Sequence, residues 1–228
     1  MNVPTIAPIK VTEYETKQSK YTHCGKLPIR SIVLGPSGSG KTTLLNILGG
    51  IALPEKGSVN LNGFDLTQLN NAERDKFRAD HIGIIFQMFN LIPYLSPLDN
   101  IILPCRFSER RNASAIERSN VKEEGLRLLS HMQLNDVVNI GSPTLELSVG
   151  QQQRVAAARS IIGSPELIIA DEPTSALDHD IREVFLNLLF EEVANAGITL
   201  LFVSHDASLA GWFDRRIKLN DINEACLK

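Results

Sequence analysis

The sequence predicts an α/β fold, in which a helical block is inserted into a core built on a parallel sheet. Three observations support this prediction. A glycine-rich turn joins a short apolar run to a helical stretch, further short apolar runs contain β-branched residues, and a long central stretch has helical periodicity. Short runs of this kind are typical of strands that are buried on both faces of a parallel sheet. A chain of 228 residues suits one sizeable core, so we expect a single domain, 1–228.

The first expected elements are strands and one helix. The stretch 6–15 alternates loosely between apolar and polar residues and predicts a strand. The run 29–34 predicts a second strand that ends in the glycine-rich turn, and 41–48 predicts the helix after it. Further buried strands of the sheet are predicted at 82–86, 167–170 and 199–203.

The helical block is expected from about residue 108 to residue 162. Four apolar residues recur on one helical face: Val121, Leu128, Leu129 and Met132. The stretch 155–162 is rich in alanine and isoleucine. We therefore expect 1–88 and 165–228 to form the core and 89–164 to form a helical subdomain.

Composition and charge narrow the class of protein. The hydrophobic fraction of 43% and the charged fraction of 21% are those of an ordinary globular domain. A formal net charge of −3 gives no electrostatic case for a nucleic-acid partner. No stretch approaches the ~20 apolar residues that span a bilayer, and 1–20 does not resemble a secretory signal, so we expect no direct membrane insertion. Cys24, Cys105 and Cys226 lie far apart and are interpreted as reduced thiols of a cytosolic protein.

The segment 35–42 matches the phosphate-binding pattern G-x-x-x-x-G-K-[ST] in full. Its residues are Gly35, Pro36, Ser37, Gly38, Ser39, Gly40, Lys41 and Thr42. Glycines allow successive backbone N–H groups to point inward around phosphates, and the next helix N-terminus adds a favourable dipole. Lys41 would reach the β- and γ-phosphates of ATP, the Thr42 hydroxyl would ligate Mg²⁺, and Thr43 would add a phosphate contact. The simpler alternative is a plain glycine-rich turn, but the flanking strand and helix favour a P-loop NTPase (RecA-like) core.

Two carboxylates, Asp171 and Glu172, follow the buried run 167–170. A strand end beside the phosphate loop is where the nucleotide site of an open α/β sheet lies. Asp171 would hold Mg²⁺ through water, and Glu172 would act as general base for the attacking water. Taken alone, the pair is equally compatible with a solvated turn.

A third motif resembles the LSGGQ signature of the ABC ATPases. Its residues are Leu147, Ser148, Val149, Gly150 and Gln151, with Val149 in place of the first glycine. The order of motifs also matches that family: phosphate loop, Gln87, signature, Asp171 with Glu172, the segment 175–178, and His205. The resemblance implies the ABC ATPase fold, in which a small antiparallel β subdomain accompanies the core and the helical subdomain.

The same resemblance implies a site shared between two subunits. Gln87 would touch Mg²⁺ or the lytic water, His205 would contact the γ-phosphate, and Asp178 would lie at the dimer interface. The opposing subunit would place Ser148 and Gly150 across the γ-phosphate, so that ATP joins two copies into a homodimer. Each residue also has a simpler interpretation: His205 as a polar strand end, Gln87 as a surface residue, and Ser148 as a helix N-cap.

Within the family, the chain is most similar to the small ATPases of the LolD, MacB and FtsE type. The matching segments are 35–41 with 44–46, 86–93, 170–174 and 204–206. The resemblance implies an ATP-hydrolysing subunit at the cytoplasmic face of the inner membrane. Its partner would be an integral-membrane permease that exports or extracts lipoproteins, peptides or drugs. The alternative is an FtsE-like ATPase that regulates cell-envelope machinery without transport.

Two features depart from the family pattern. Val149 in the signature is expected to have a mild effect, because Ser148 and Gly150 remain. The family also places an aromatic side chain against adenine, upstream of the phosphate loop; Tyr14 is the candidate here and Tyr21 the alternative. A tyrosine in a strand of the small sheet is an equally good interpretation.

The connection 88–95 is unusually apolar and suggests a partner surface. We expect 91–95 to form one wall of a groove that receives a short helix of the permease. The alternative is that Phe89, Leu91 and Leu95 attach the helical block to the core.

Overall fold

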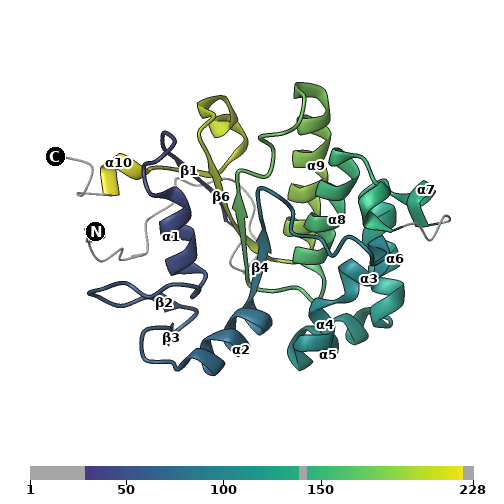
Figure 1. The fold of residues 1–228 in the computed structure, drawn as a ribbon, viewed down its shortest axis with the longest axis horizontal. Helices are drawn as coiled ribbons and strands as arrows, with labels where there is room; N and C mark the ends of the chain where they lie inside the picture. Colours follow the sequence, from purple (N-terminus) through teal and green to yellow (C-terminus); the bar gives the residue numbers. More distant parts are fainter. Residues whose placement is uncertain (1–28, 139–142, 223–228) are drawn as a thin grey trace, which may run out of the picture.

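Five strands form the central sheet of the computed structural model, which describes residues 29–138 and 143–222 (Figure 1). They are β1 (Arg30–Leu34), β4 (Ile82–Ile85), β5 (Leu167–Asp171), β6 (Thr199–Ser204) and β7 (Arg215–Lys218). Their order is β4-β5-β6-β1-β7, and each neighbouring pair is parallel. The predicted α/β fold with a parallel sheet is therefore confirmed. The strand expected at 6–15 lies outside the described residues, as do Tyr14 and Tyr21.

Strands β1, β4, β5 and β6 begin and end within one residue of the predicted runs. They are easy to find because each contains several apolar residues, most of them buried. The sequence did not predict β7, whose residues alternate between partly buried and exposed and include Arg215, Arg216 and Lys218. It pairs with β1 at the edge of the sheet, where charged side chains reach water.

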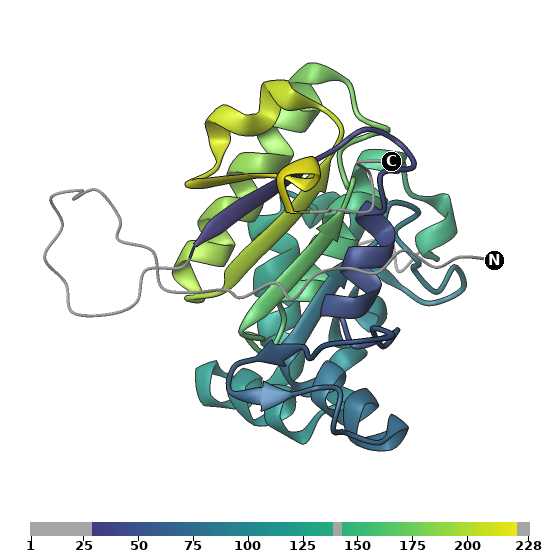
Figure 2. The same cartoon turned by 90° about the vertical axis from the view of Figure 1, so that its left-hand side faces the viewer.

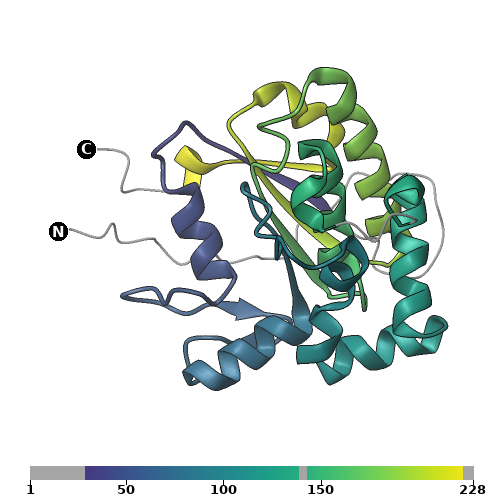
Figure 3. The same cartoon turned by 45° about the vertical axis from the view of Figure 1, so that its right-hand side comes forward.

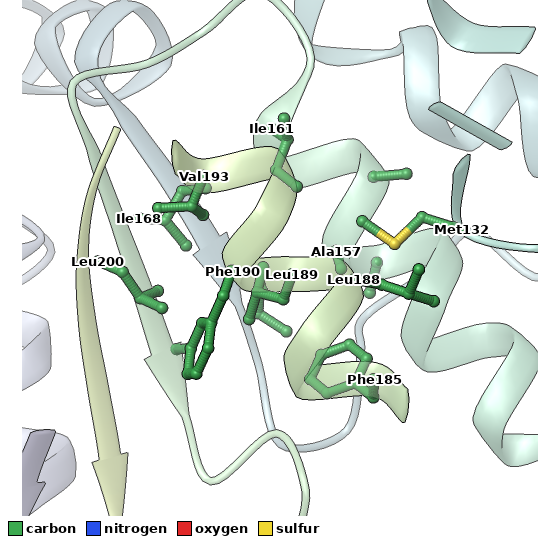
Figure 4. Close-up of a cluster of buried hydrophobic side chains, with 14 of the residues drawn as sticks. Met132, Ala157, Ile161, Ile168, Phe185, Leu188, Leu189, Phe190, Val193 and Leu200 are labelled. Carbon is green, nitrogen blue, oxygen red and sulfur yellow. The ribbon is translucent and has the colours of Figure 1, made fainter. Parts of the chain in front are cut away.

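Neighbouring residues of each strand face opposite sides of the sheet, and each side has its own helices. Ile168 and Phe202 belong to a core cluster shared with α8 (Val149–Ile161) and α9 (His179–Asn195). Their neighbours Ile169 and Val203 belong to a second cluster, shared with α1 (Lys41–Leu48) and α2 (Asn71–His81). Figure 1 shows α1 on one side of the sheet and α8 with α9 on the other, and Figure 2 views the sheet from the side of α1. Figure 4 shows α9 side chains in the first cluster.

The helical block comes forward in Figure 3. Its elements before α8 are α3 (Pro97–Ile102), α4 (Pro104–Phe107), α5 (Glu109–Arg118), α6 (Val121–His131), α7 (Asn135–Val138) and the 3₁₀ helix η1 (Thr144–Glu146). Helical structure thus begins at Pro97, earlier than the predicted residue 108. The Ser96 side chain caps α3 by accepting from the Asp99 N–H, and Pro97 occupies the first helical position, where proline is well tolerated.

The expected helical face is present in α6 and the residue after it. Leu128, Leu129 and Met132 are fully buried, and Val121 packs against the same cluster.

The remaining elements are the two-stranded antiparallel sheet of β2 (Asn60–Leu61) and β3 (Phe64–Asp65), the 3₁₀ helix η2 (Ala207–Trp212) and α10 (Leu219–Ile222). In the described parts of the chain, no helix is long and apolar enough to cross a membrane.

The C-terminal end of helix α8 packs directly onto β4. A Cβ atom built on Gly83 of β4 would lie 2.3 Å from the Ser160 carbonyl oxygen, so only glycine fits this contact. The buried Arg111 of α5 donates to the Ser160 carbonyl at 2.6 Å and to the Ile162 carbonyl at 2.9 Å. An arginine at a helix C-terminus satisfies carbonyls that have no partner within the helix. The Gly83 contact holds α8 against the sheet, and the Arg111 hydrogen bonds hold the same end of α8 to α5.

Candidate functional site

The predicted site residues follow the carboxyl ends of four neighbouring strands. Leu34 pairs with Ser204, Asp171 with Val203, and Ile85 with Ala170. The phosphate loop, Glu172, His205 and Gln87 each come one or two residues after these paired positions. The register therefore brings four motifs, far apart in the sequence, to one edge of the sheet, where open α/β sheets bind ligands.

The phosphate loop joins β1 to α1. Gly38 has a φ of 78° and Gly40 a φ of 94°, a left-handed backbone conformation that favours glycine. The Pro36 carbonyl accepts from the Ser39 N–H and hydroxyl, which closes the turn. Pro36, Ser37, Gly38, Thr42 and Thr43 are exposed. The loop thus presents its polar backbone at the start of α1.

Lys41 lies buried inside this loop, with 7% of its surface exposed. Its ammonium donates to the carbonyls of Gly35 and Pro36, at 2.9 Å each. The same nitrogen is 3.3 Å from Glu172 Oε1. A positive charge is therefore held where the loop meets the end of β5.

Glu172 bridges two of the predicted residues. Its second carboxylate oxygen lies 2.9 Å from His205 Nδ1, so the carboxylate contacts both Lys41 and His205. The Glu172 N–H donates to the Val203 carbonyl at 3.0 Å. Its φ of 44° is unusual for a residue other than glycine, and such strained positions cluster at functional sites.

Thr42 and Asp171 bring two oxygen ligands together. The Thr42 hydroxyl donates to Asp171 Oδ2 at 3.3 Å. Burial raises the pKa of Asp171 above its usual value, although the Thr42 hydrogen bond opposes this shift. A hydroxyl and a carboxylate are hard oxygen donors, and Mg²⁺ is commonly held by one or two carboxylates together with substrate phosphates. This donor set fits Mg²⁺. Gln87 is exposed beyond β4 on the same edge of the sheet.

The signature residues begin α8 on the other face of the sheet. Ser148 is the N-cap, as one of its interpretations predicted: its hydroxyl accepts from the Gln151 N–H, and the Gln151 side chain accepts from the Ser148 N–H. Ser148, Val149 and Gly150 line a hollow of about 490 Å³ together with Asp178 at the N-cap position of α9. Val149 is 49% exposed. The predicted site thus forms two separate groups within one chain.

Sequence reasoning missed one ion pair beside His205. Arg182 of α9 donates to Asp206, the residue after His205, at 2.6 Å. Asp206 also accepts from the N–H and hydroxyl of Ser208. These contacts fix the segment that carries His205 against α9. Arg182 and Asp206 are 24 positions apart, so no local pattern in the sequence indicates the pair.

Comparisons with known proteins agree with the fold and with the family resemblance. The family model described as ABC transporter matches residues 29–175. An ABC transporter ATP-binding protein of Methanocaldococcus jannaschii, MJ0796, is 41% identical over 189 residues, which are 83% of this chain and 79% of that protein. An ABC transporter ATP-binding protein of Mycobacterium tuberculosis is 40% identical over 189 residues, covering 82% of this chain and 72% of that protein. The macrolide export ATP-binding/permease protein MacB of Rhodopirellula baltica is 38% identical over 83% of this chain, but only 27% of that protein is covered.

Solved structures are similar as well. A dimeric structure of MJ0796 in a post-hydrolysis state, bound to ADP and Pi, has a TM-score of 0.72 and 38% sequence identity, and the match covers 83% of this chain and 80% of that one. A second dimeric structure of MJ0796 has the same TM-score, with 37% identity over 85% of this chain and 83% of that one. The chain therefore belongs to the ABC transporter family, as one of its ATP-binding cassettes.

Proposed function

We propose that this chain hydrolyses ATP as one half of a nucleotide-bridged homodimer and thereby drives a membrane permease. The observation that carries the proposal is the Glu172 carboxylate, which contacts Lys41 and His205 next to the Thr42–Asp171 pair. These residues combine a phosphate-binding cation, a carboxylate base and oxygen ligands at one edge of the sheet. Phosphoryl transfer needs little beyond positioning and charge neutralisation, and this group supplies both.

Each residue has a role in that reaction. The amides of the phosphate loop and the ammonium of Lys41 bind the phosphates of ATP. Glu172 accepts a proton from the attacking water, and His205 holds the Glu172 carboxylate in place and reaches the γ-phosphate. Thr42, Asp171 and Gln87 would hold Mg²⁺, which neutralises charge on the phosphate oxygens when bound. Gln87 also orients the water.

The second half of the site comes from another copy of the chain. Within one chain, α1 and α8 cover opposite faces of the sheet (Figure 1), so the phosphate loop and the signature belong to separate groups. The MJ0796 structures are dimers, which supports the same arrangement here. We propose that Ser148, Gly150 and the α8 N-terminus of one copy contact the γ-phosphate bound by the other, with Val149 and Gln151 beside them and Asp178 at the interface.

The partner surface is proposed at the segment after Gln87. Met88 is 81% exposed, Tyr94 is 77% exposed and Leu145 is 72% exposed. The Leu145 N–H donates to the Pro93 carbonyl, so η1, which precedes the signature, lies beside 93–95. Phe89, by contrast, is buried and Leu91 packs against the core, which agrees with the alternative expectation for these two residues. An exposed apolar group of this kind is typical of an interaction site.

The relatives support a proposal for the finer role of the chain. Similarity to MacB, named as an ATP-binding/permease protein, supports a permease as partner, and we place the chain at the cytoplasmic face of the inner membrane. Export or extraction of lipoproteins, peptides or drugs is the role that we propose, with FtsE-like regulation as the alternative. Co-purification from membranes, followed by mass spectrometry of the partner, distinguishes them. A permease with a transport pathway supports the first role, and a partner that belongs to cell-envelope machinery supports the second.

The substitution Glu172→Gln tests hydrolysis and dimerisation together. It keeps the shape of the side chain and removes the basic carboxylate, so ATP should still bind while cleavage stalls. At high protein concentration in saturating ATP·Mg²⁺, the variant should elute as a dimer from a size-exclusion column.

Glu166→Gln is the matched control, because Glu166 directly precedes β5, at the end of the strand away from Glu172, and pairs with His81. It should behave as the wild type. A Glu172→Gln protein that hydrolyses ATP normally, or stays monomeric, would contradict the proposal.

A further inference from the structure

Arg159 connects the signature helix to the turn that follows Gln87. It lies in the last turn of α8. Its Nη1 donates to the Asn90 carbonyl at 2.7 Å and its Nη2 donates to the Phe89 carbonyl at 2.6 Å. A guanidinium is planar and presents its donors in a fixed fork. Two successive carbonyls that bind the same fork are therefore held in a fixed orientation relative to α8.

The turn that Arg159 binds has an unfavourable backbone. Phe89 has a φ of 60° and Asn90 a φ of 48°. Asparagine tolerates this left-handed region, but a bulky residue such as phenylalanine rarely adopts it. Residues in such conformations persist only when their surroundings hold them there. The buried Phe89 side chain is one such restraint, and the two hydrogen bonds from Arg159 are a second.

A second side chain of α8 makes a similar contact just after the neighbouring strand, β5. Gln153 is fully buried, and its side-chain amide donates to the carbonyl of Pro173, the residue after Glu172. Helix α8 thus contacts the backbone just beyond Gln87 through Arg159 and the backbone just beyond Glu172 through Gln153. The same helix begins with Ser148 at the signature. Burial lowers the pKa of Arg159, and its two carbonyl contacts offset the lost hydration of the guanidinium.

We propose that Arg159 is a positioning residue, which fixes the turn after Gln87 to α8 so that Gln87 and the signature move as one body. The proposal rests on the proposed ATP hydrolysis, since Gln87 acts on the attacking water and the metal. Among the described residues, the side-chain hydrogen bonds of Arg159 go to these two backbone carbonyls, so its effect on the reaction passes through Gln87. A movement of the permease against 88–95 would then reach α8, and so the signature, through these two hydrogen bonds together with the packing of Phe89.

Two variants and one control test this inference. Arg159→Met removes both donors and keeps an unbranched apolar stem, whereas Arg159→Lys keeps the charge without the fork. Arg216→Met is the control, because Arg216 is exposed and donates to the Ala210 carbonyl, outside the helical block. The first measurement is hydrogen–deuterium exchange in peptides that cover 86–92. The Phe89 N–H donates to the Phe86 carbonyl and the Asn90 N–H to the Met88 carbonyl, so both amides report on the turn.

We expect faster exchange of these amides in Arg159→Met, an intermediate rate in Arg159→Lys, and no change in Arg216→Met. Unchanged exchange in Arg159→Met would overturn the inference. This measurement needs no ATPase activity, so it decides the role of Arg159 in the turn even if the proposed function fails. A wild-type protein that does not hydrolyse ATP would overturn the proposed function instead.

The second measurement is a double-mutant cycle in steady-state ATP hydrolysis. Because a small misplacement of a positioning group is costly, Arg159→Met should lower kcat by about 10- to 100-fold. It should change KM by less than about twofold, since the phosphate loop is intact. In a Gln87→Ala background the same substitution should have almost no further effect. If Arg159 had a purely structural role, Arg159→Met would instead have a lower melting temperature, and the kcat of its folded fraction would equal that of the wild type. Additive losses in the cycle would equally contradict action through Gln87.

Discussion

The contact between β4 and α8 allows a quantitative test of how the signature helix is held. In Gly83→Ala, the new Cβ would lie 2.3 Å from the Ser160 carbonyl oxygen, 3.0 Å from the Ser160 carbonyl carbon and 3.1 Å from Ile168 Cγ1. Two of these atoms are backbone and cannot rotate away, so α8 must move from β4 by roughly 1 Å. Overpacking of this kind costs about 1–3 kcal/mol. Gly83 has no positive φ, so alanine regains about 0.4–1 kcal/mol through the unfolded state. The midpoints of these two ranges leave a net loss of about 1.3 kcal/mol, and the largest net loss is about 2.6 kcal/mol.

Urea denaturation followed by circular dichroism measures this loss. A shift of the midpoint at constant slope reports a change in stability alone. Gly211→Ala is the matched control: an added Cβ there meets no atom within 4 Å, and Gly211 also lacks a positive φ. The control should gain about 0.4–1 kcal/mol of stability, because alanine restricts the unfolded chain and nothing opposes it at this position. If Gly83→Ala were as stable as Gly211→Ala, the close packing of α8 on β4 would not limit the fold, and our account would be wrong.

Three further predictions concern the site. Lys41→Ala should abolish phosphate release while the protein still folds, because it removes the charge-assisted contact to the phosphates; wild-type turnover would refute this role. Asp171→Asn should raise the free energy of unfolding at pH 7, because folding raises the pKa of Asp171 and thus disfavours the ionised carboxylate. This gain in stability should vanish below about pH 4, where the carboxyl group is protonated in the folded and the unfolded state alike. If the variant showed no gain at any pH, the carboxylate would be well solvated and the reasoning wrong. Tyr94→Ser with Leu145→Ser should leave ATP hydrolysis and folding intact but prevent co-purification with a permease, whereas retained co-purification would place the partner surface elsewhere.

The sequence was most informative where a residue type has one dominant physical use. Buried strands such as β5 need apolar residues on both faces, and the phosphate loop needs glycine at Gly38 and Gly40, so both are visible as patterns. The start of the helical block was misplaced because Pro97 and Pro104 look like helix breakers, although both occupy positions where proline begins a helix. Strands β2 and β3 have two residues each, too few for any periodicity.

Within the site, sequence order predicted which residues gather but not how they are held. The contacts of Glu172 with Lys41 and His205 depend on strand register, which pairs Asp171 with Val203. Arg159 and Arg182 carry no motif that marks them, because each acts on a partner distant in the chain. The left-handed turn at Phe89 is equally invisible, since neither residue type nor spacing favours it.

The placement of α1 and α8 on opposite faces of the sheet has a genetic consequence. In the proposed dimer, no chain completes a site with its own residues. A Lys41→Ala chain is defective in the phosphate loop, and a Ser148→Asp chain is defective in the signature although aspartate still caps α8. A mixed dimer of the two contains one site with both defects and one site with neither. Two preparations that are inactive alone should therefore restore hydrolysis when mixed, and two such alleles should complement each other in a cell.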